Sequence, residues 1–229
     1  MNTVKLKTDI MLHIENNILL YLLIIFTFIT GVAAGGFTIN YIAPERQEHL
    51  AQYLYDHSYL LKNQAHVNKS VIYLNSVLQN VKTAFFIWFF GLYYVCIPLM
   101  LITVGFRGFL LGFTVAFFID YYGFNGFLFI ISCILPQCFI YVPCIVVMGI
   151  ISLQYGIHSF KNRKIYYNKQ VKFQRMAAYT WKFLLIIIPF LIVGLYETFV
   201  VPFIFRALFV NVFSDKGLEH LILNRSFIV

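Results

Sequence analysis

The chain has 229 residues, of which 61% are hydrophobic and 11% are charged, and its mean hydropathy is +0.80. Soluble domains carry about a quarter charged residues, so this composition excludes a large soluble domain. We therefore expect one integral membrane domain that occupies residues 1–229. Lys and Arg exceed Asp and Glu by 17 to 9, and in a membrane protein this excess sets orientation and contacts anionic lipid.

The apolar stretches predict an all-α fold, a polytopic bundle of five transmembrane helices. The predicted spans cover residues 18–42, 84–104, 109–122, 127–153 and 183–205. The first span could also be read as a signal peptide, because Lys5 and Lys7 precede it. Its apolar run is longer than the core of such a peptide, so we expect an uncleaved first helix.

The distribution of Lys and Arg predicts the orientation of these spans. Residues 156–182 carry many basic side chains and no acidic one, which indicates a cytoplasmic loop. The connection "DYYGFNG" has no Lys or Arg and should lie outside. The N-terminus is then cytoplasmic, the C-terminus is extracytoplasmic, and the protein is a multi-pass protein of the cell membrane. The side chains expected at lipid headgroups are Arg107, Lys161, Arg163 and Lys164.

Residues 43–83 form the predicted outer loop, and their pattern is helical. Pro44 stands at a plausible first helical position, and Glu45 and Glu48 follow it early in the helix. A second helix should begin near Asn68. These helices could pack on the protein's own bundle, lie on the membrane or bind a partner. The candidates for partner binding are Tyr53, Leu54, Tyr55, Tyr59 and Leu61.

The sequence offers no constellation for catalysis. The four cysteines Cys96, Cys133, Cys138 and Cys144 fall in apolar spans without CxxC spacing, which is typical of small hydrophobic core residues. The outer-loop histidines have no cysteine cluster or HExxH motif beside them, so a zinc site is only a minor alternative. No GxSxG motif or Walker loop is present. We expect no catalytic residues, no cofactor, no metal and no nucleic-acid partner, while a homo-oligomer remains open.

A few polar and kink-forming residues lie inside the apolar spans. Pro136 and Pro143 flank Gln137 in "ILPQCFIYVPC", and Glu197 lies in the last span. Gln137 and Glu197 could hydrogen-bond across helices, which would satisfy both groups in the membrane. Alternatively, Glu197 reaches outer water, or it serves transport or a proton relay. Small residues at Gly105, Gly108 and Gly112 predict close helix packing.

These motifs together resemble the stage II sporulation protein M family. The resemblance rests on "RGFLLGFTVAFFIDYYGFNG", on the helix broken by Leu-Pro-Gln, and on "LYETFVVPFI", in which Glu197 and Pro202 stand at the matching positions. Many broader relatives carry Pro-His-Gly where this chain has Pro136, Gln137 and Cys138. This departure favours the sporulation branch over relatives linked to circular-bacteriocin maturation.

The resemblance implies a function that the composition does not reveal. It implies that this chain is a non-enzymatic scaffold of the engulfment machinery in endospore-forming bacteria. Such a scaffold localises two peptidoglycan-degrading partners, stage II sporulation proteins D and P, at the forespore septum. The alternative is a permease-like or export component that works with an ABC ATPase, as in circular-bacteriocin maturation.

Overall fold

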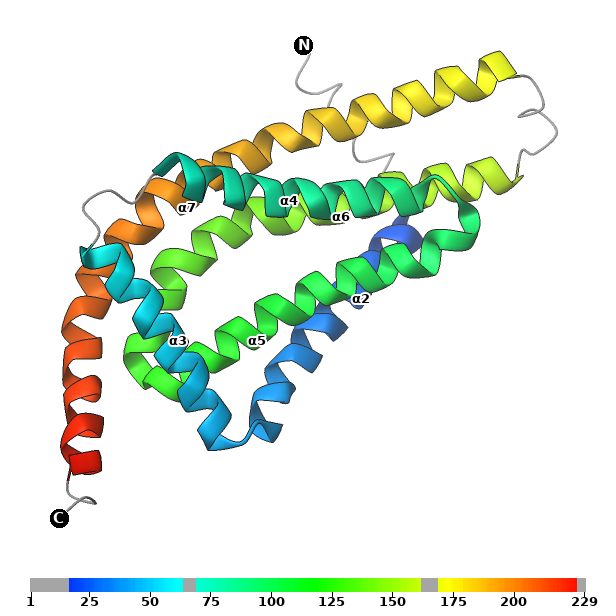
Figure 1. Ribbon diagram of the computed structural model, residues 1–229. Coiled ribbons are helices and arrows are strands. Elements are labelled where there is room, and N and C mark those ends of the chain that lie inside the picture. The colour runs from blue at the N-terminus through cyan, green and yellow to red at the C-terminus, as the bar shows by residue number, and fades with distance from the viewer. Residues whose placement is uncertain (1–16, 64–68, 162–168, 226–229) are drawn as a thin grey trace, which may run out of the picture.

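The computed structural model describes the backbone of residues 17–63, 69–161 and 169–225, and the side chains of residues 17–53, 73–161 and 170–201. Every regular element in these ranges is helical, which confirms the predicted all-α class (Figure 1). The longer helices are α2 (Ile18–Thr38), α3 (Pro44–Asn63), α4 (Lys69–Gly91), α5 (Ile97–Phe129), α6 (Leu135–Lys161) and α7 (Lys169–Arg225). The short elements are two 3-10 turns, η1 (Ile39–Tyr41) and η2 (Tyr94–Cys96), and the π-helical turn η3 (Ile130–Ile134).

Three helical segments of the described chain are long and apolar enough to cross a membrane, so the protein is a membrane protein. They are Ile18–Tyr41, Tyr94–Lys161 and Gln170–Val201. The second segment has 68 residues, but the chain turns within it at Gly123. Gly123 has a φ of 59°, a left-handed conformation that a residue without a β-carbon adopts readily.

The predicted boundaries of the second and third spans are wrong. The sequence reading ran one span through residues 84–104 and placed Arg107 in a connection before residues 109–122. In the structure the chain instead breaks at η2, and α5 continues as a helix through Arg107. The reason lies in "GLYYVCIP", where Gly91 ends α4 and Pro98 enters the first turn of α5.

The helices that contain the fourth and fifth predicted spans have other bounds than those spans. Helix α6 extends to Lys161, and α7 begins at Lys169, so most of the basic region 156–182 is helical rather than loop. Within region 156–182, the backbone of residues 162–168, with Arg163 and Lys164, lies outside the described residues. The distortion near Pro136 is η3, which directly precedes the first turn of α6.

Helices α2 and α5 approach each other closely along paired glycines. A β-carbon on Gly108 or Gly112 would overlap the α2 backbone at Phe28 or Val32. On α2, a β-carbon on Gly31 or Gly35 would overlap the α5 backbone in the same way. The helices can therefore pack backbone to backbone, which small residues permit in membranes. Gly105 is the exception, since a β-carbon there would make ordinary contact with Thr27.

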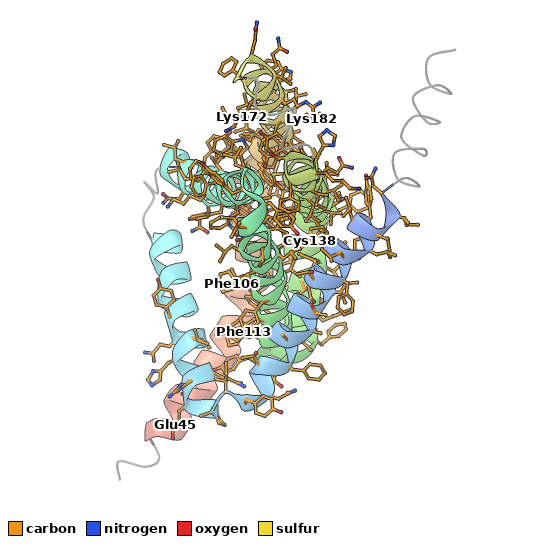
Figure 2. The ribbon with its side chains drawn as sticks, turned by 90° about the vertical axis from the view of Figure 1, so that its right-hand side faces the viewer. Glu45, Phe106, Phe113, Cys138, Lys172 and Lys182 are labelled. Atoms are coloured by element: carbon orange, nitrogen blue, oxygen red, sulfur yellow. The ribbon has the colours of Figure 1, made fainter. Side chains whose placement is uncertain are left out.

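The two ends of the bundle carry different charges. Figure 2 shows Lys172 and Lys182 at one end of the molecule and Glu45 at the other. The turn η2 lies at the basic end, because the Tyr94 ring stacks on Phe160 near the end of α6, with ring centroids 4.3 Å apart. We call the end with Lys172 and Lys182 the basic end, and we call the opposite end, with Glu45, the Gly123 end.

Candidate functional site

The Glu197 carboxylate of α7 lies between two other helices and accepts a hydrogen bond from each. The Gln137 amide of α6 donates to Oε1, and the Ser76 hydroxyl of α4 donates to Oε2. The structure therefore brings together the two polar residues that the sequence singled out, and it adds Ser76. A serine in "YLNSVLQN" carries no signal of such a role, so sequence reasoning missed it.

Tyr196, the neighbour of Glu197, satisfies a carbonyl group that Pro136 leaves without its usual partner. In an α-helix the carbonyl of residue i accepts the N–H of residue i+4, and proline has no N–H. The Ser132 carbonyl stands four residues before Pro136, and the Tyr196 hydroxyl donates to it at 2.8 Å. Two successive residues of α7 thus hold the distorted start of α6.

Arg107 of α5 is half-buried and contacts residues of α4 and α6. Its Nη2 donates to the Gln79 carbonyl of α4 at 2.9 Å, and its guanidinium carbon lies 6.0 Å from the centre of the Tyr141 ring. It also interacts electrostatically with Glu197. Its predicted contact with lipid headgroups stays a prediction. We call Glu197, Gln137, Ser76, Arg107 and Tyr141 the Glu197 cluster.

A second polar group ties the same three helices nearer the basic end. The Tyr179 hydroxyl of α7 donates to the Trp88 carbonyl of α4 at 2.9 Å, and it lies 3.0 Å from the Ser152 hydroxyl of α6. Ser152 is fully buried. The Trp88 indole donates to Thr180 at 3.3 Å. We call these four residues the Tyr179 cluster, and the sequence reading did not find it.

Helix α3 packs on the Gly123 end through one face and exposes another. Ala51 is buried with Ile39, Phe117 and Phe118 in an apolar cluster. Tyr53 stands two residues further along, and 67% of its surface is exposed. The remaining partner-binding candidates, Leu54, Tyr55, Tyr59 and Leu61, have side chains outside the described residues, although α3 runs through all four positions.

The other predicted residues have mixed environments. Pro143 lies inside α6 and is exposed, and the side chain of Pro202 is outside the described residues. Lys161 is exposed at the end of α6. All four cysteines are free thiols, and Cys133 is buried. Within the part of the chain that the structure describes, no three His, Cys, Asp or Glu side chains lie close enough to share a metal ion.

These features define an all-helical integral membrane protein whose buried polar side chains connect helices to one another. The family description that matches is stage II sporulation protein M, over residues 24–202. This match covers more than half of the chain, and the chain belongs to the stage II sporulation protein M family. Neither a curated protein nor a solved structure gives a significant match.

Proposed function

We propose that this protein is a non-enzymatic membrane scaffold of the sporulation engulfment machinery. Its role is to localise the extracytoplasmic wall hydrolases, stage II sporulation proteins D and P, at the forespore septum. The family match over residues 24–202 carries this proposal. The hydrogen bonds on Glu197 support it, because both carboxylate oxygens are engaged in holding α4, α6 and α7 together.

The proposal includes five membrane crossings, made by α2, α4, α5, α6 and α7. Helix α4 has 23 residues and so reaches about 35 Å, enough for a hydrocarbon core of about 30 Å. The basic end, with Lys161, Lys172 and Lys182, is cytoplasmic, and the Gly123 end is extracytoplasmic. Helix α3 then lies outside, with Tyr53 exposed where a wall-modifying partner can reach it.

Cysteine labelling tests this topology at two turns. The four native cysteines are first replaced by serine or alanine, and Tyr93→Cys or Phe124→Cys is introduced. Both side chains are exposed, at 61% and 74%. An impermeant thiol reagent should label Phe124→Cys in intact protoplasts, and Tyr93→Cys only after permeabilisation. Labelling of Tyr93→Cys from outside would refute the assignment.

Recruitment of the hydrolases tests the role of α3. The variant carries Tyr53→Ser, Tyr55→Ser and Tyr59→Ser, and Tyr93→Ser at the opposite end serves as the control. Aromatic anchors often dominate binding surfaces, so the triple variant should recover about tenfold less hydrolase from membranes. The control should recover as much as the unaltered protein. Normal recovery with the triple variant would remove α3 from the binding surface.

A permease-like component that works with an ABC ATPase is the second candidate. One observation favours it: the half-buried side chains Arg107 and Glu197 are ionisable and lie in apolar helices, and such groups often mark ion or substrate paths in membranes. Pull-down from native membranes separates the two candidates. An ATPase without a wall hydrolase among the bound proteins would favour the permease.

A further inference from the structure

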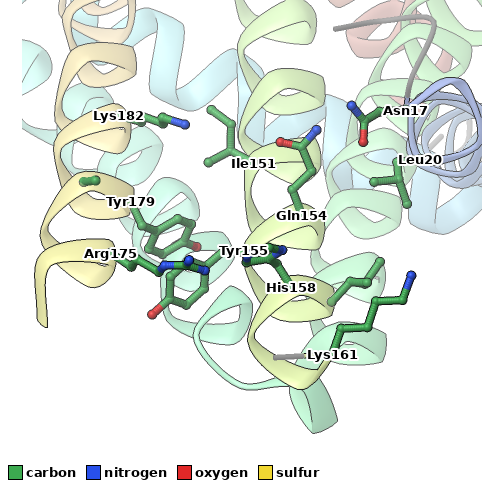
Figure 3. Close-up of a pocket in the computed structure, with 12 residues that line it drawn as sticks. Asn17, Leu20, Ile151, Gln154, Tyr155, His158, Lys161, Arg175, Tyr179 and Lys182 are labelled. Atoms are coloured by element: carbon green, nitrogen blue, oxygen red, sulfur yellow. The ribbon is translucent and has the colours of Figure 1, made fainter. Parts of the chain in front are cut away.

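A pocket of about 620 Å³ opens at the basic end between the consecutive helices α6 and α7 and the start of α2. Asn17 precedes α2, Gln154 and Lys161 come from α6, and Arg175 and Lys182 come from α7. Figure 3 shows the side chains of Lys182 and Arg175 extending from α7 toward α6, and Gln154 extending toward Asn17. Neither the Glu197 cluster nor the surface of α3 takes part in this pocket.

The lining combines positive charge with an apolar floor. Lys161, Arg175 and Lys182 are cationic, and no described side chain of the lining is acidic. The sequence has no Asp or Glu between residues 121 and 196, so the two helices that supply most of the lining carry no carboxylate there. Leu20 and Ile151 contribute apolar surface to the same pocket. This combination fits an anion attached to an apolar body.

The position of the pocket along the helices agrees with such a ligand. It lies near the adjoining ends of the apolar segments Tyr94–Lys161 and Gln170–Val201, and in the proposed topology this part of both helices is close to the lipid headgroups. Trp181, beside Lys182, is 65% exposed, and indole rings are enriched at this interface. Further along α7, Leu184 and Leu185 are exposed and offer surface for acyl chains.

We propose that this pocket binds the phosphate of an anionic phospholipid headgroup. Arg175 and Lys182 hold the phosphate oxygens, since a guanidinium and an ammonium both donate strong hydrogen bonds to phosphate. The amides of Gln154 and Asn17 lie on the other side of the pocket and are placed to bind the polar part of the headgroup. The bound lipid connects α2, α6 and α7 at the membrane surface. The proposal stands independently of the scaffold role.

Native mass spectrometry of the purified full-length protein tests the site with three probes: phosphatidylglycerol, phosphatidylcholine with the same acyl chains, and inorganic phosphate. We expect one phosphatidylglycerol to bind each chain at least about tenfold more tightly than phosphatidylcholine. Each basic side chain that contacts the bound phosphate should contribute about fivefold to the affinity, as a basic side chain does at an anionic membrane surface. The double variant Arg175→Gln/Lys182→Gln should therefore bind about 30-fold more weakly.

A charge-matched control distinguishes a built site from diffuse attraction. Lys82→Gln/Lys172→Gln also removes two positive charges, and both lysines are exposed and outside the pocket lining. This control should weaken binding less than about threefold, and both variants should elute and melt as folded protein. The single variant Lys161→Gln gives an independent reading, with an expected loss of about fivefold.

Four results would overturn the proposal. The first is an equal loss of affinity for phosphatidylglycerol in the double variant and in its control. The second is binding of phosphatidylcholine as tight as that of phosphatidylglycerol. The third is inorganic phosphate that binds alone as tightly as the lipid and displaces it. The fourth is tighter binding of a polyglutamate peptide than of phosphatidylglycerol, which would assign the pocket to an acidic protein partner.

Discussion

The Glu197 cluster and the Tyr179 cluster both connect α4, α6 and α7, and the Glu197 cluster also includes Arg107 of α5, but the two differ in chemistry. The Tyr179 cluster uses neutral hydroxyls, an indole and backbone carbonyls at distances of 2.9–3.3 Å. The Glu197 cluster contains a carboxyl group and a guanidinium. The two lie 15 residues apart on α6, or about 22 Å along its axis. Polar interactions therefore connect α4, α6 and α7 at two positions along the bundle.

This difference in chemistry predicts how much stability is lost when either cluster loses a partner. A neutral hydroxyl that loses its partner in the membrane forfeits a modest amount of free energy, because the group can often find another acceptor. An ionisable group that loses its partner is left unsatisfied in a medium that solvates it poorly. The Glu197 cluster should therefore be more sensitive to substitution, although both connect α4, α6 and α7.

The largest expected effect is that of Glu197→Leu. It leaves the Gln137 amide and the Ser76 hydroxyl without their acceptor. Each interhelical hydrogen bond contributes about 0.6–2 kcal/mol, so the loss of both should cost about 1–4 kcal/mol. Unfolding in mixed micelles should show this loss, and Leu195→Ile, at an exposed neighbouring position, should not change stability. A stable Glu197→Leu protein would contradict the structural role.

Gln137→Leu should have an intermediate effect. It removes one of the two donors to Glu197 and leaves the bond from Ser76 in place. An interhelical hydrogen bond in a membrane contributes about 0.6–2 kcal/mol, and the same unfolding assay can resolve this loss. Phe139→Leu is the control, because Phe139 is 81% exposed on the same helix. Equal losses in the two variants would mean that α6 tolerates no change there, irrespective of the amide.

Tyr179→Phe should have the smallest effect. It removes the hydroxyl that donates to the Trp88 carbonyl, but it keeps the ring that stacks on Tyr155 with centroids 4.4 Å apart. Ser152 still donates to the Ile87 carbonyl. The expected cost is about 0.5–1 kcal/mol. Tyr93→Phe at an exposed position is the control. A cost equal to that of Glu197→Leu would erase the contrast between the two clusters.

The sequence predicts those features whose residues differ from their neighbours in polarity or in backbone preference. Glu197 and Gln137 stand out because polar groups are rare in apolar spans, and Pro44 marks the start of α3. The glycines of α5 were also recognised. Their counterparts Gly31 and Gly35 on α2 have the same spacing in "GVAAG" and are not among the predicted packing residues.

The remaining features could not be read from composition or spacing. Tyr179, Ser152 and Trp88 are common residue types, and only packing of α4, α6 and α7 brings them together. Hydropathy predicts that the second span continues through η2, because "LYYVCI" is nearly as apolar as the helices around it. The flanking Gly91 and Pro98 are the local signal that places the break.

The most direct test of the scaffold account is engulfment in a spore-forming host. Its own family member is replaced there by this protein carrying the substitution Glu197→Gln. An amide keeps the size of the carboxyl group and can still accept a hydrogen bond, but it cannot carry a proton or a charge through the membrane. Abundance and insertion are measured in the same cells. The account predicts near-normal engulfment and septal localisation of the wall hydrolases. A correctly inserted, abundant Glu197→Gln protein that fails to support engulfment would contradict it and assign Glu197 a proton-coupled role.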